Sequence, residues 1–283
     1  MKKDELVKAM TSLGLHPGKK LGQNFLIDAN LLDFIFRQAN PQKGDIILEV
    51  GPGFGCLTKK LVESGALVIA IELDKRLFEY LKENINFSNF KLIQGDACRL
   101  DIESLISESC GKKSENPAWK CVANLPYSIS TPFVMTIARL RNQPIEMQLL
   151  LQKETAERFS AQPSTKAYGA VSAVLQSIYD VTLVRSIPPQ VFYPPPKVMS
   201  ALSNFKLRKT EYDFNFEDYI AFIKMAFSFK RKKLVSNLSE LFPPPVSKDA
   251  LSRLNLSESV RAEELSPKIF IELYTLLNAF RKS

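Results

Sequence analysis

The sequence predicts an α/β protein with a doubly wound, mostly parallel sheet, followed by a small helical domain. From about residue 44, short apolar runs alternate with amphipathic stretches. These runs lack a polar face, which is typical of parallel strands covered by helices on both sides. After about Arg208, helical periodicity replaces the alternation. We therefore expect an α/β domain over residues 1–207 and a helical domain over residues 208–283.

The parallel sheet is expected to contain strands at residues 45–50, 67–73, 91–96, 120–125 and 146–152. Amphipathic stretches at 57–63 and 75–84 are expected to form helices between them. Two later β-rich runs, 181–187 and 201–207, flank a proline-rich segment and predict an antiparallel hairpin at the sheet edge. The second domain should then hold helices within residues 216–229, 232–242, 247–255 and 266–280.

Length and composition indicate an ordinary globular protein. Its 283 residues are 45% hydrophobic, which is enough for a substantial core. The basic N-terminus lacks a following apolar segment, and no apolar run approaches the roughly 18 residues of a membrane span. We expect a cytoplasmic monomer without a membrane anchor. The cysteines lack paired spacing and His16 is the only histidine, so we expect neither disulfides nor a metal site.

The charge balance favours a polyanionic partner. Lysine and arginine total 38 against 30 acidic residues, a net charge of +8. A surface charge that only keeps the protein soluble is the alternative.

The first strand runs into a glycine-rich turn, GPGFG (51–55), that opens a helix. Glycines allow close approach of a ligand, and a helix N-terminus offers unpaired N–H groups. The spacing is G-x-G-x-G, which differs from the dinucleotide pattern G-x-G-x-x-G. A tight strand-to-helix turn without a ligand explains the glycines equally well.

Two acidic residues follow the next strands. Glu72 stands about 20 residues beyond the first glycine, where a carboxylate accepts hydrogen bonds from ribose hydroxyls. Asp96 ends the following strand and is placed to accept from an adenine amino group, with Ala97 leaving room for the ring. Each carboxylate alone is more simply a solvated or capping group. Because successive strand ends share one edge of such a sheet, the ordered set indicates a nucleoside site.

The fourth strand ends in the tetrapeptide Asn124, Leu125, Pro126, Tyr127. The Asn124 side-chain oxygen and the Leu125 carbonyl can accept the protons of an exocyclic amine and aim its lone pair. Pro126 stiffens the turn, and Tyr127 can stack on the base. This suits methyl transfer from a sulfonium donor to an adenine amine better than hydride transfer. Alone, the tetrapeptide is only an Asn-x-Pro turn with a half-buried tyrosine.

With these residues in place, the chain resembles the 16S ribosomal RNA adenine N6,N6-dimethyltransferases over nearly its whole length. That family joins a class I, Rossmann-like S-adenosylmethionine-dependent methyltransferase domain to a small helical domain. The motifs that carry the resemblance are KKLGQNFL (19–26), EVGPGFGCLT (49–58), IELD (71–74), GDA (95–97), NLPYSIS (124–130), LLQKETAERF (150–159), FYPPPKV (192–198), KRKKL (230–234) and RAEELSP (261–267).

The resemblance implies specific roles. Asn24 and Leu26 would close over the methionine part of S-adenosylmethionine beside Gly51. Asn124 would touch both the cofactor and the target amine. Phe192 would pair with Tyr127 to sandwich a flipped base, although core packing is the commoner role of such a phenylalanine.

The implied partner is 16S rRNA within a 30S precursor particle, methylated on two adjacent adenosines near the 3′ end. Phosphate contacts are expected from six basic residues: Lys19, Lys20, Lys230, Arg231, Lys232 and Lys233. A charge run that is merely a solvated helix face is the alternative.

This sequence departs from the family pattern at Phe54, Cys56 and Thr155, none of which is a proposed donor or acceptor. Two other functions stay open: an erythromycin-resistance type 23S rRNA adenine methyltransferase, and a ribosome-assembly or transcription factor that uses the fold only to bind nucleic acid. The acidic strand ends and the N-L-P-Y sequence favour an enzyme over a pure binding factor.

Overall fold

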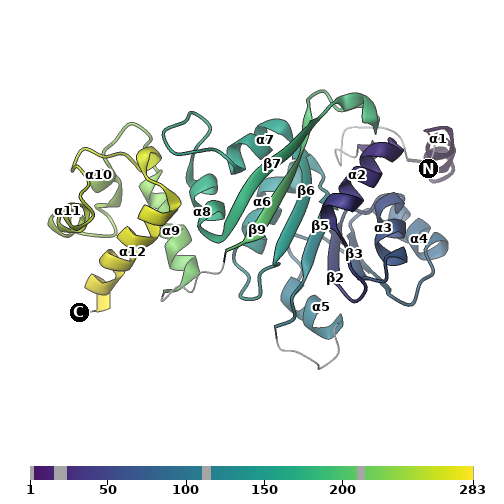
Figure 1. The fold of residues 1–283 in the computed structure, drawn as a ribbon, viewed down its shortest axis with the longest axis horizontal. Helices are drawn as coiled ribbons and strands as arrows, with labels where there is room; N and C mark the ends of the chain where they lie inside the picture. Colours follow the sequence, from purple (N-terminus) through teal and green to yellow (C-terminus); the bar gives the residue numbers. More distant parts are fainter. Residues whose placement is uncertain (1–2, 16–23, 110–115, 209–213, 283) are drawn as a thin grey trace. The chain divides into compact units, whose positions relative to one another are not determined.

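A computed structural model describes residues 3–15, 24–109, 116–208 and 214–282 (Figure 1). The chain forms two compact units. The first contains Met1–Ala156 and Thr182–Leu207, and the second contains Glu157–Val181 and Arg208–Ser283. The α/β domain was expected over residues 1–207 and the helical domain over residues 208–283, whereas segment Glu157–Val181 groups here with the C-terminal helices.

The described part of the first unit is built on a seven-stranded sheet with the order β4-β3-β2-β5-β6-β9-β7 (Figure 1). Its strands are β2 (Ile46–Val50), β3 (Leu67–Glu72), β4 (Phe90–Gln94), β5 (Lys120–Asn124), β6 (Glu146–Gln152), β7 (Tyr179–Ile187) and β9 (Ser200–Leu207). Strands β2 to β6 are parallel, and β9 runs antiparallel beside β6. The expected α/β class and the pair of late strands at the sheet edge are therefore confirmed.

The order of the strands places the carboxyl end of β2 at the centre of the site. Strand β2 lies between β3 and β5. The chain adds β3 and β4 on one side of β2 and then β5 and β6 on the other, so the strand order reverses at β2. Ligands of open α/β sheets bind beyond the carboxyl ends of the strands at such a switch point. Glu72, Asn124 and the glycine loop all lie at this carboxyl edge.

Helices of the first unit are α1 (Lys3–Ser12), α2 (Ala29–Ala39), α3 (Cys56–Glu63), α4 (Lys75–Asn84), α5 (Ile102–Ser109) and α6 (Ser130–Ile137). The side chain of Asp28 caps α2 by accepting from the Leu31 N–H at 2.7 Å. One face of α2 and of α3 packs on buried residues of β2 and β3. The expected helices at 57–63 and 75–84 are thus confirmed as α3 and α4.

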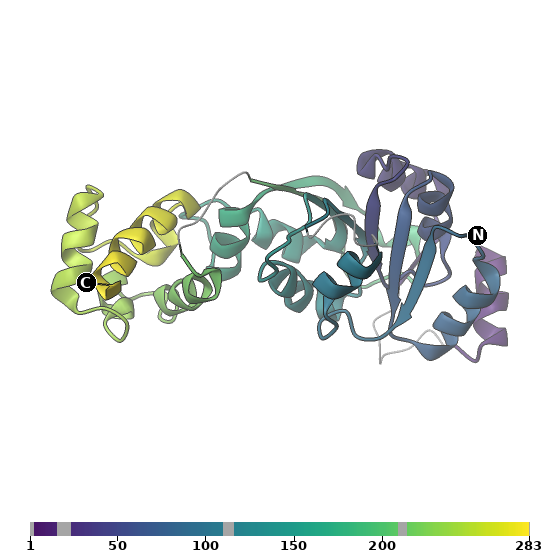
Figure 2. The ribbon, with the colours of Figure 1, turned by 90° about the horizontal axis from the view of Figure 1, so that it is seen from below.

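The second unit is helical: α8 (Ala170–Ile178), α9 (Phe216–Ala226), α10 (Leu234–Leu238), α11 (Pro244–Arg253) and α12 (Pro267–Lys282), with α7 (Lys153–Phe159) crossing from the first unit. Helix α12, yellow in Figure 2, packs on α8, α9 and α11. Aromatic rings fill the interior of this unit. The ring centroids of Tyr219 and Phe222 lie 5.5 and 5.0 Å from that of Tyr274. Because α8 is buried along nearly its whole length, it completes this aromatic core, which explains why residues 157–181 join the second unit.

None of the helices in the described ranges is long and apolar enough to cross a membrane. Within those same ranges, histidine, cysteine, aspartate and glutamate side chains form no group of three or more that could hold a metal ion.

Gly55, the residue before α3, packs closely against Leu81 of α4 and Ile85, and an alanine there should destabilise the protein. Gly55 has φ +74°, and an added Cβ would collide with Ile85 and lie 3.0 Å from Leu81, both buried. We expect Gly55→Ala to lower the free energy of unfolding by about 1–3 kcal/mol more than Gly44→Ala. Gly44 is the matched control, since its φ of +89° imposes similar backbone strain while its Cβ would meet nothing within 4 Å. If denaturant unfolding shows that the two variants lose the same free energy of unfolding, this packing is contradicted.

Candidate functional site

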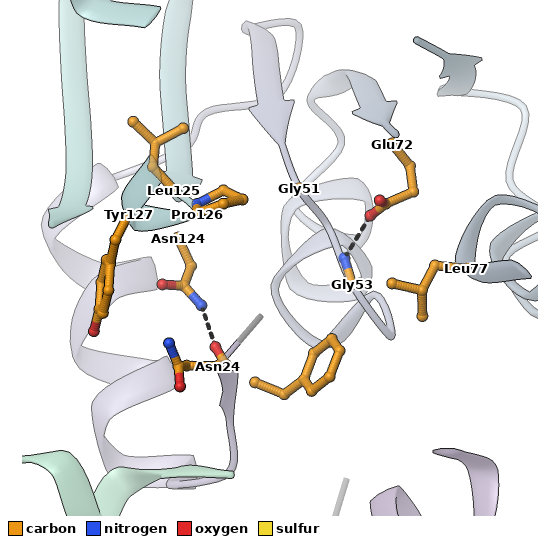
Figure 3. Close-up of a pocket in the computed structure, with 10 residues that line it drawn as sticks. Asn24, Gly51, Gly53, Glu72, Leu77, Asn124, Leu125, Pro126 and Tyr127 are labelled. Carbon is orange, nitrogen blue, oxygen red and sulfur yellow. Dashed lines mark hydrogen bonds between the residues drawn. The ribbon is translucent and has the colours of Figure 1, made fainter. Parts of the chain in front are cut away.

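Backbone hydrogen bonds tie the ends of three neighbouring strands together. The Gly51 N–H donates to the Ile71 carbonyl at 3.0 Å, and the Gly95 N–H donates to the Glu72 carbonyl at 3.0 Å. These bonds continue the sheet beyond its last strand residues and fix the loops that follow. A pocket opens beside them, lined by Gly51, Glu72 and Asn124 among others (Figure 3). The predicted row of strand-end residues is therefore assembled at one edge.

Glu72 is a buried carboxylate at the end of β3. One of its oxygens accepts from the Gly53 N–H at 3.3 Å (Figure 3). The other accepts from the Asp74 N–H at 2.9 Å. Burial raises the pKa of Glu72 to about 7, although these two backbone donors oppose the shift. The carboxylate therefore lies where it can bind hydroxyl groups, and its charge changes close to neutral pH.

The glycine loop adopts a conformation that side chains rarely allow. Gly51, Gly53 and Gly55 all have φ between +60° and +74°. A Cβ on Gly51 would lie 3.3 Å from Pro126, and one on Gly53 would lie 3.1 Å from the Phe25 ring. Glycine is required here because the loop passes close to the side chains of Pro126 and Phe25, which line the pocket.

A second hollow adjoins the first through Gly51, Glu72 and Pro126, which line both. Its remaining lining comes from the ends of β2, β3 and β4 and from the turn after β5: Val50, Ile71, Leu73, Gly95, Asp96, Ala97, Ser128 and Ile129. The Asp96 carboxylate accepts from the Cys98 N–H at 2.9 Å and lies 3.5 Å from Arg99. Largely apolar walls, with the Asp96 carboxylate at the end of β4 in addition to Glu72, suit a purine ring with an amino group. Ile129 and Leu73 were not predicted, since no motif marks an apolar wall.

The orientation of the Asn124 amide is fixed by a residue 100 positions away. Its Nδ2 donates to the backbone carbonyl of Asn24 at 3.1 Å (Figure 3). The amide nitrogen is thereby hydrogen-bonded to the backbone of a residue that lines the pocket. The Oδ1 is the atom of the side chain that can accept a hydrogen bond from a ligand. Asn24 and Gly51, which were expected to lie side by side, line the same pocket.

Tyr127 closes the other side of this pocket. Pro126 has φ −53°, and a short 3-10 helix, η1 (Tyr127–Ile129), follows it. The Tyr127 hydroxyl lies 2.6 Å from the hydroxyl of Ser200, a buried residue of β9. Burial raises the pKa of Tyr127, so the phenol is protonated at neutral pH. The ring of Tyr127 is half-buried and lines the pocket.

Strand β1 (Phe25–Leu26), whose Phe25 lines the same pocket as Tyr127, pairs antiparallel with β8 (Phe192–Tyr193). Directly opposite residues of such a pair share a face. Phe25 and Tyr193 pack with α1 and Phe54, whereas Leu26 and Phe192 pack in the main core. The Phe25 and Phe54 ring centroids are 5.0 Å apart. Phe25 was missed from the sequence, although it lies inside the quoted QNFL motif.

The pairing of Phe192 with Tyr127 around a flipped base stays a prediction. Phe192 is only 2% exposed and lies in the main core with Leu26. The reason is the alternation of side chains in β8, which turns Phe192 inward and Tyr193 outward. Leu26 likewise lines a neighbouring, largely apolar hollow under the glycine loop, and Asn24 is the residue that reaches the main pocket.

Glu49 is a second buried carboxylate, and it was not predicted from the sequence. It stands in β2, is 2% exposed, and lines the hollow under the glycine loop. Its Oε2 has no hydrogen-bond partner among the described residues. Burial raises the pKa of Glu49 to about 8, and the charge of Glu72 adds to the increase. A glutamate at the start of the EVGPG motif was the available signal.

Four of the six predicted RNA-binding residues lie on one exposed turn, here named the basic turn (Lys230–Lys233), between α9 and α10. Helix α9 was expected to continue to residue 229 and ends at Ala226 instead. Asn237 stabilises this end by donating to the carbonyls of Ala226 and Phe229, at 2.6 and 3.2 Å. The Phe229 ring is 56% exposed, with the Lys232 Nζ 4.2 Å from its centroid. Lys19 and Lys20 lie outside the described residues.

The residues at the carboxyl edge fit S-adenosylmethionine. A buried carboxylate for ribose hydroxyls, an apolar slot with Asp96 at its rim, and a glycine loop that lets a ligand approach lie in one continuous region. A dinucleotide would need the phosphate-binding glycine pattern that the loop lacks.

Comparison with known proteins agrees with this arrangement. The family model described as ribosomal RNA adenine dimethylase matches residues 16–279. A ribosomal RNA small subunit methyltransferase A of Ureaplasma urealyticum is 38% identical over 264 residues, covering 93% of this chain and 92% of the relative. The Chlamydia caviae protein of the same name is 35% identical over 280 residues, covering 98% of this chain and 97% of the relative.

Solved structures show the same fold. A dimethyladenosine transferase from Plasmodium falciparum superposes with a TM-score of 0.76 at 26% identity, covering 90% of this chain and 98% of that one. The 23S rRNA methyltransferase ErmE gives a TM-score of 0.68 at 20% identity, covering 90% of this chain and all of ErmE, a similarity of fold alone. The methyltransferase fold that the family resemblance implied is thus confirmed, and the chain belongs to the ribosomal RNA adenine dimethylase family.

Proposed function

We propose that this protein is an S-adenosylmethionine-dependent dimethyltransferase of 16S rRNA. It would act as a cytoplasmic monomer on a 30S precursor particle, methylating the N6 amines of two adjacent adenosines near the 3′ end. The names of its relatives from Ureaplasma and Chlamydia, which refer to the small ribosomal subunit, support this substrate over 23S rRNA.

The orientation of Asn124 is the observation that carries the proposal. The bond from its Nδ2 to the Asn24 carbonyl leaves Oδ1 as an acceptor in a pocket that also holds Tyr127 and Pro126. A nucleoside-binding site for any other chemistry has no need of an acceptor directed at this point. A binding factor that has lost catalysis would likewise have no need to fix the amide.

The chain's own residues would then prepare the adenine amine for attack. Asn124 Oδ1 and the Leu125 carbonyl accept its two protons, which directs the nitrogen lone pair away from them. Tyr127 stacks on the base and holds the ring plane. S-adenosylmethionine, when bound, supplies an electrophilic methyl group on its sulfonium sulfur. The amine loses a proton once it is methylated, so no strong general base is needed among the lining residues.

The second unit would contribute contacts to RNA phosphates. The four cations of the basic turn are all exposed, and none is ion-paired with a carboxylate among the described residues. Exposed lysine and arginine side chains bind phosphates by releasing condensed counterions.

Methyl transfer by the wild type and by Asn124→Ala tests the proposal. Wild type with labelled S-adenosylmethionine should produce dimethyladenosine in small-subunit particles that lack the modification, and none in naked 23S rRNA. Asn124→Ala should lower the rate on the order of 10²-fold or more, because the amine is no longer oriented. Nucleoside analysis of the digested RNA measures both.

Asn204→Ala is the matched control. Asn204 is a partly buried asparagine of β9 whose Nδ2 donates at 3.0 Å to Glu146, the first residue of β6, away from the carboxyl edge. It should retain near-wild-type transfer. Dimethyladenosine found only in 23S rRNA would refute the substrate, and its absence from both RNAs would favour the binding-factor alternative.

The affinity for S-adenosylmethionine should fall in acid because of Glu72. The ionised carboxylate accepts from the ribose hydroxyls, and its pKa in the free protein is about 7. Lowering the pH from 8 to 6 protonates it and should raise Kd by about tenfold, since one pH unit below the pKa leaves roughly a tenth ionised. Isothermal titration calorimetry measures this. Glu72→Gln should bind weakly and lose this part of the pH dependence; an unchanged pH slope in the variant would exclude Glu72 as its source.

Neutralising the basic turn should weaken RNA binding without affecting the cofactor. Substituting Lys230, Arg231, Lys232 and Lys233 by glutamine should flatten the dependence of log Kd on log salt by about 0.7–0.9 for each phosphate that is no longer neutralised. Lys248, Arg253 and Lys268, each already paired with a carboxylate, provide the control triple variant. Unaltered RNA affinity in the basic-turn variant would show that the turn is only a solvated surface.

A further inference from the structure

Ser200 is a buried residue that touches the site without lining its pockets. It is the first residue of β9, it is fully buried, and its hydroxyl lies 2.6 Å from that of Tyr127. We propose that Ser200 is a positioning residue for methyl transfer, which holds the Tyr127 ring as a preformed stacking surface for the target adenine. This inference rests on the function proposed above.

The sheet topology explains how a residue so distant in sequence reaches Tyr127. Strand β9 is antiparallel to its neighbour β6, so its first residue lies at the edge where the parallel strands end. Ser200 is paired with Gln152, the last residue of β6, while Asn124 at the end of β5 is paired with Leu150. Tyr127 therefore crosses the end of β6 to meet the beginning of β9.

The start of β9 is itself held in place. The Lys153 N–H donates to the Met199 carbonyl at 2.9 Å, directly beyond the Gln152–Ser200 pair. Ser200 is thus anchored by backbone bonds on the strand, and its hydroxyl is a fixed partner for the phenol.

The Tyr127 side chain is consequently restrained at both ends. Pro126 and the 3-10 turn, closed by the Ile129 N–H to the Pro126 carbonyl at 3.1 Å, restrain its backbone. Ser200 restrains the far end of the ring. A stacking surface that is already oriented binds a base without the entropic cost of ordering the side chain.

The hydroxyl pair serves orientation and not proton transfer. Burial raises the pKa of Tyr127, and a serine hydroxyl does not ionise at neutral pH. Neither group can therefore take the proton that the methylated amine loses.

Ser203 supplies a matched control. It lies on the same strand, is equally buried, and its hydroxyl has no hydrogen-bond partner among the described residues. A general packing effect of removing a buried hydroxyl from β9 would appear in both Ser200→Ala and Ser203→Ala. A positioning effect would appear only in Ser200→Ala.

The test compares Ser200→Ala, Tyr127→Phe, their double variant and Ser203→Ala. We expect Ser200→Ala and Tyr127→Phe each to lower kcat/KM for RNA by about 2- to 12-fold, the range of one hydrogen bond. The double variant should lose no more than either single one, because both remove the same bond. Ser203→Ala should match the wild type, and all four should bind S-adenosylmethionine with unchanged Kd.

A second readout does not depend on catalysis. A synthetic hairpin with two adjacent adenosines should bind the wild type more tightly than the same RNA with an abasic target position, because only a base can stack. Ser200→Ala and Tyr127→Phe should reduce this preference, and Ser203→Ala should keep it. Equal behaviour of Ser200→Ala and Ser203→Ala, or losses that multiply in the double variant, would overturn the inference. A wild type that shows the preference without transferring methyl groups would refute the proposed reaction alone.

Discussion

The common alignment of the strand ends is the constraint on which the site depends. In a parallel sheet, the residues that follow the strands lie at the same edge. The hydrogen bonds from Gly51 to Ile71 and from Gly95 to Glu72 hold the ends of β2, β3 and β4 together there. The glycine loop, the buried carboxylate and the Asn124 turn are useful only as a set. A shift of one residue in the register of β3 would turn Glu72 to the opposite face of the sheet and break up that set.

Two carboxylates buried at this edge oppose folding. Both Glu49 and Glu72 have pKa values in the folded protein above their ordinary range. The folded protein therefore holds protons that the unfolded chain releases above about pH 4.5, and stability falls as the pH rises toward 7 and 8. Raising a pKa by one corresponds to about 1.4 kcal/mol. Two buried carboxylates are thus maintained at this edge against the stability of the protein.

Local patterns predicted the parts of the site that follow directly from strand ends. Glu72, Asp96 and Asn124 could be placed because strand periodicity and order determine which edge they share. The orientation of Phe192 could not be predicted, because it depends on pairing with β1, a strand more than 160 residues earlier in the chain. The contact of Ser200 with Tyr127 and the burial of Glu49 are likewise tertiary. Segment 157–181 was expected in the α/β domain and groups instead with the C-terminal helices, because α8 packs on α9 and α12, which follow it in the chain.

The pairing of β1 with β8 has a consequence for the order in which the protein folds. The two strands are short and far apart in sequence, so we expect them to pair only after the main sheet has brought Phe25 and Tyr193 near each other. Asn24, whose carbonyl accepts from Asn124, directly precedes β1 and would be placed by this late pairing. We expect a chain that has formed its sheet but not this last pairing to be nearly complete in structure and still unable to hold the Asn124 amide in place. The site would then be completed in the final step of folding, well after the chain has become compact.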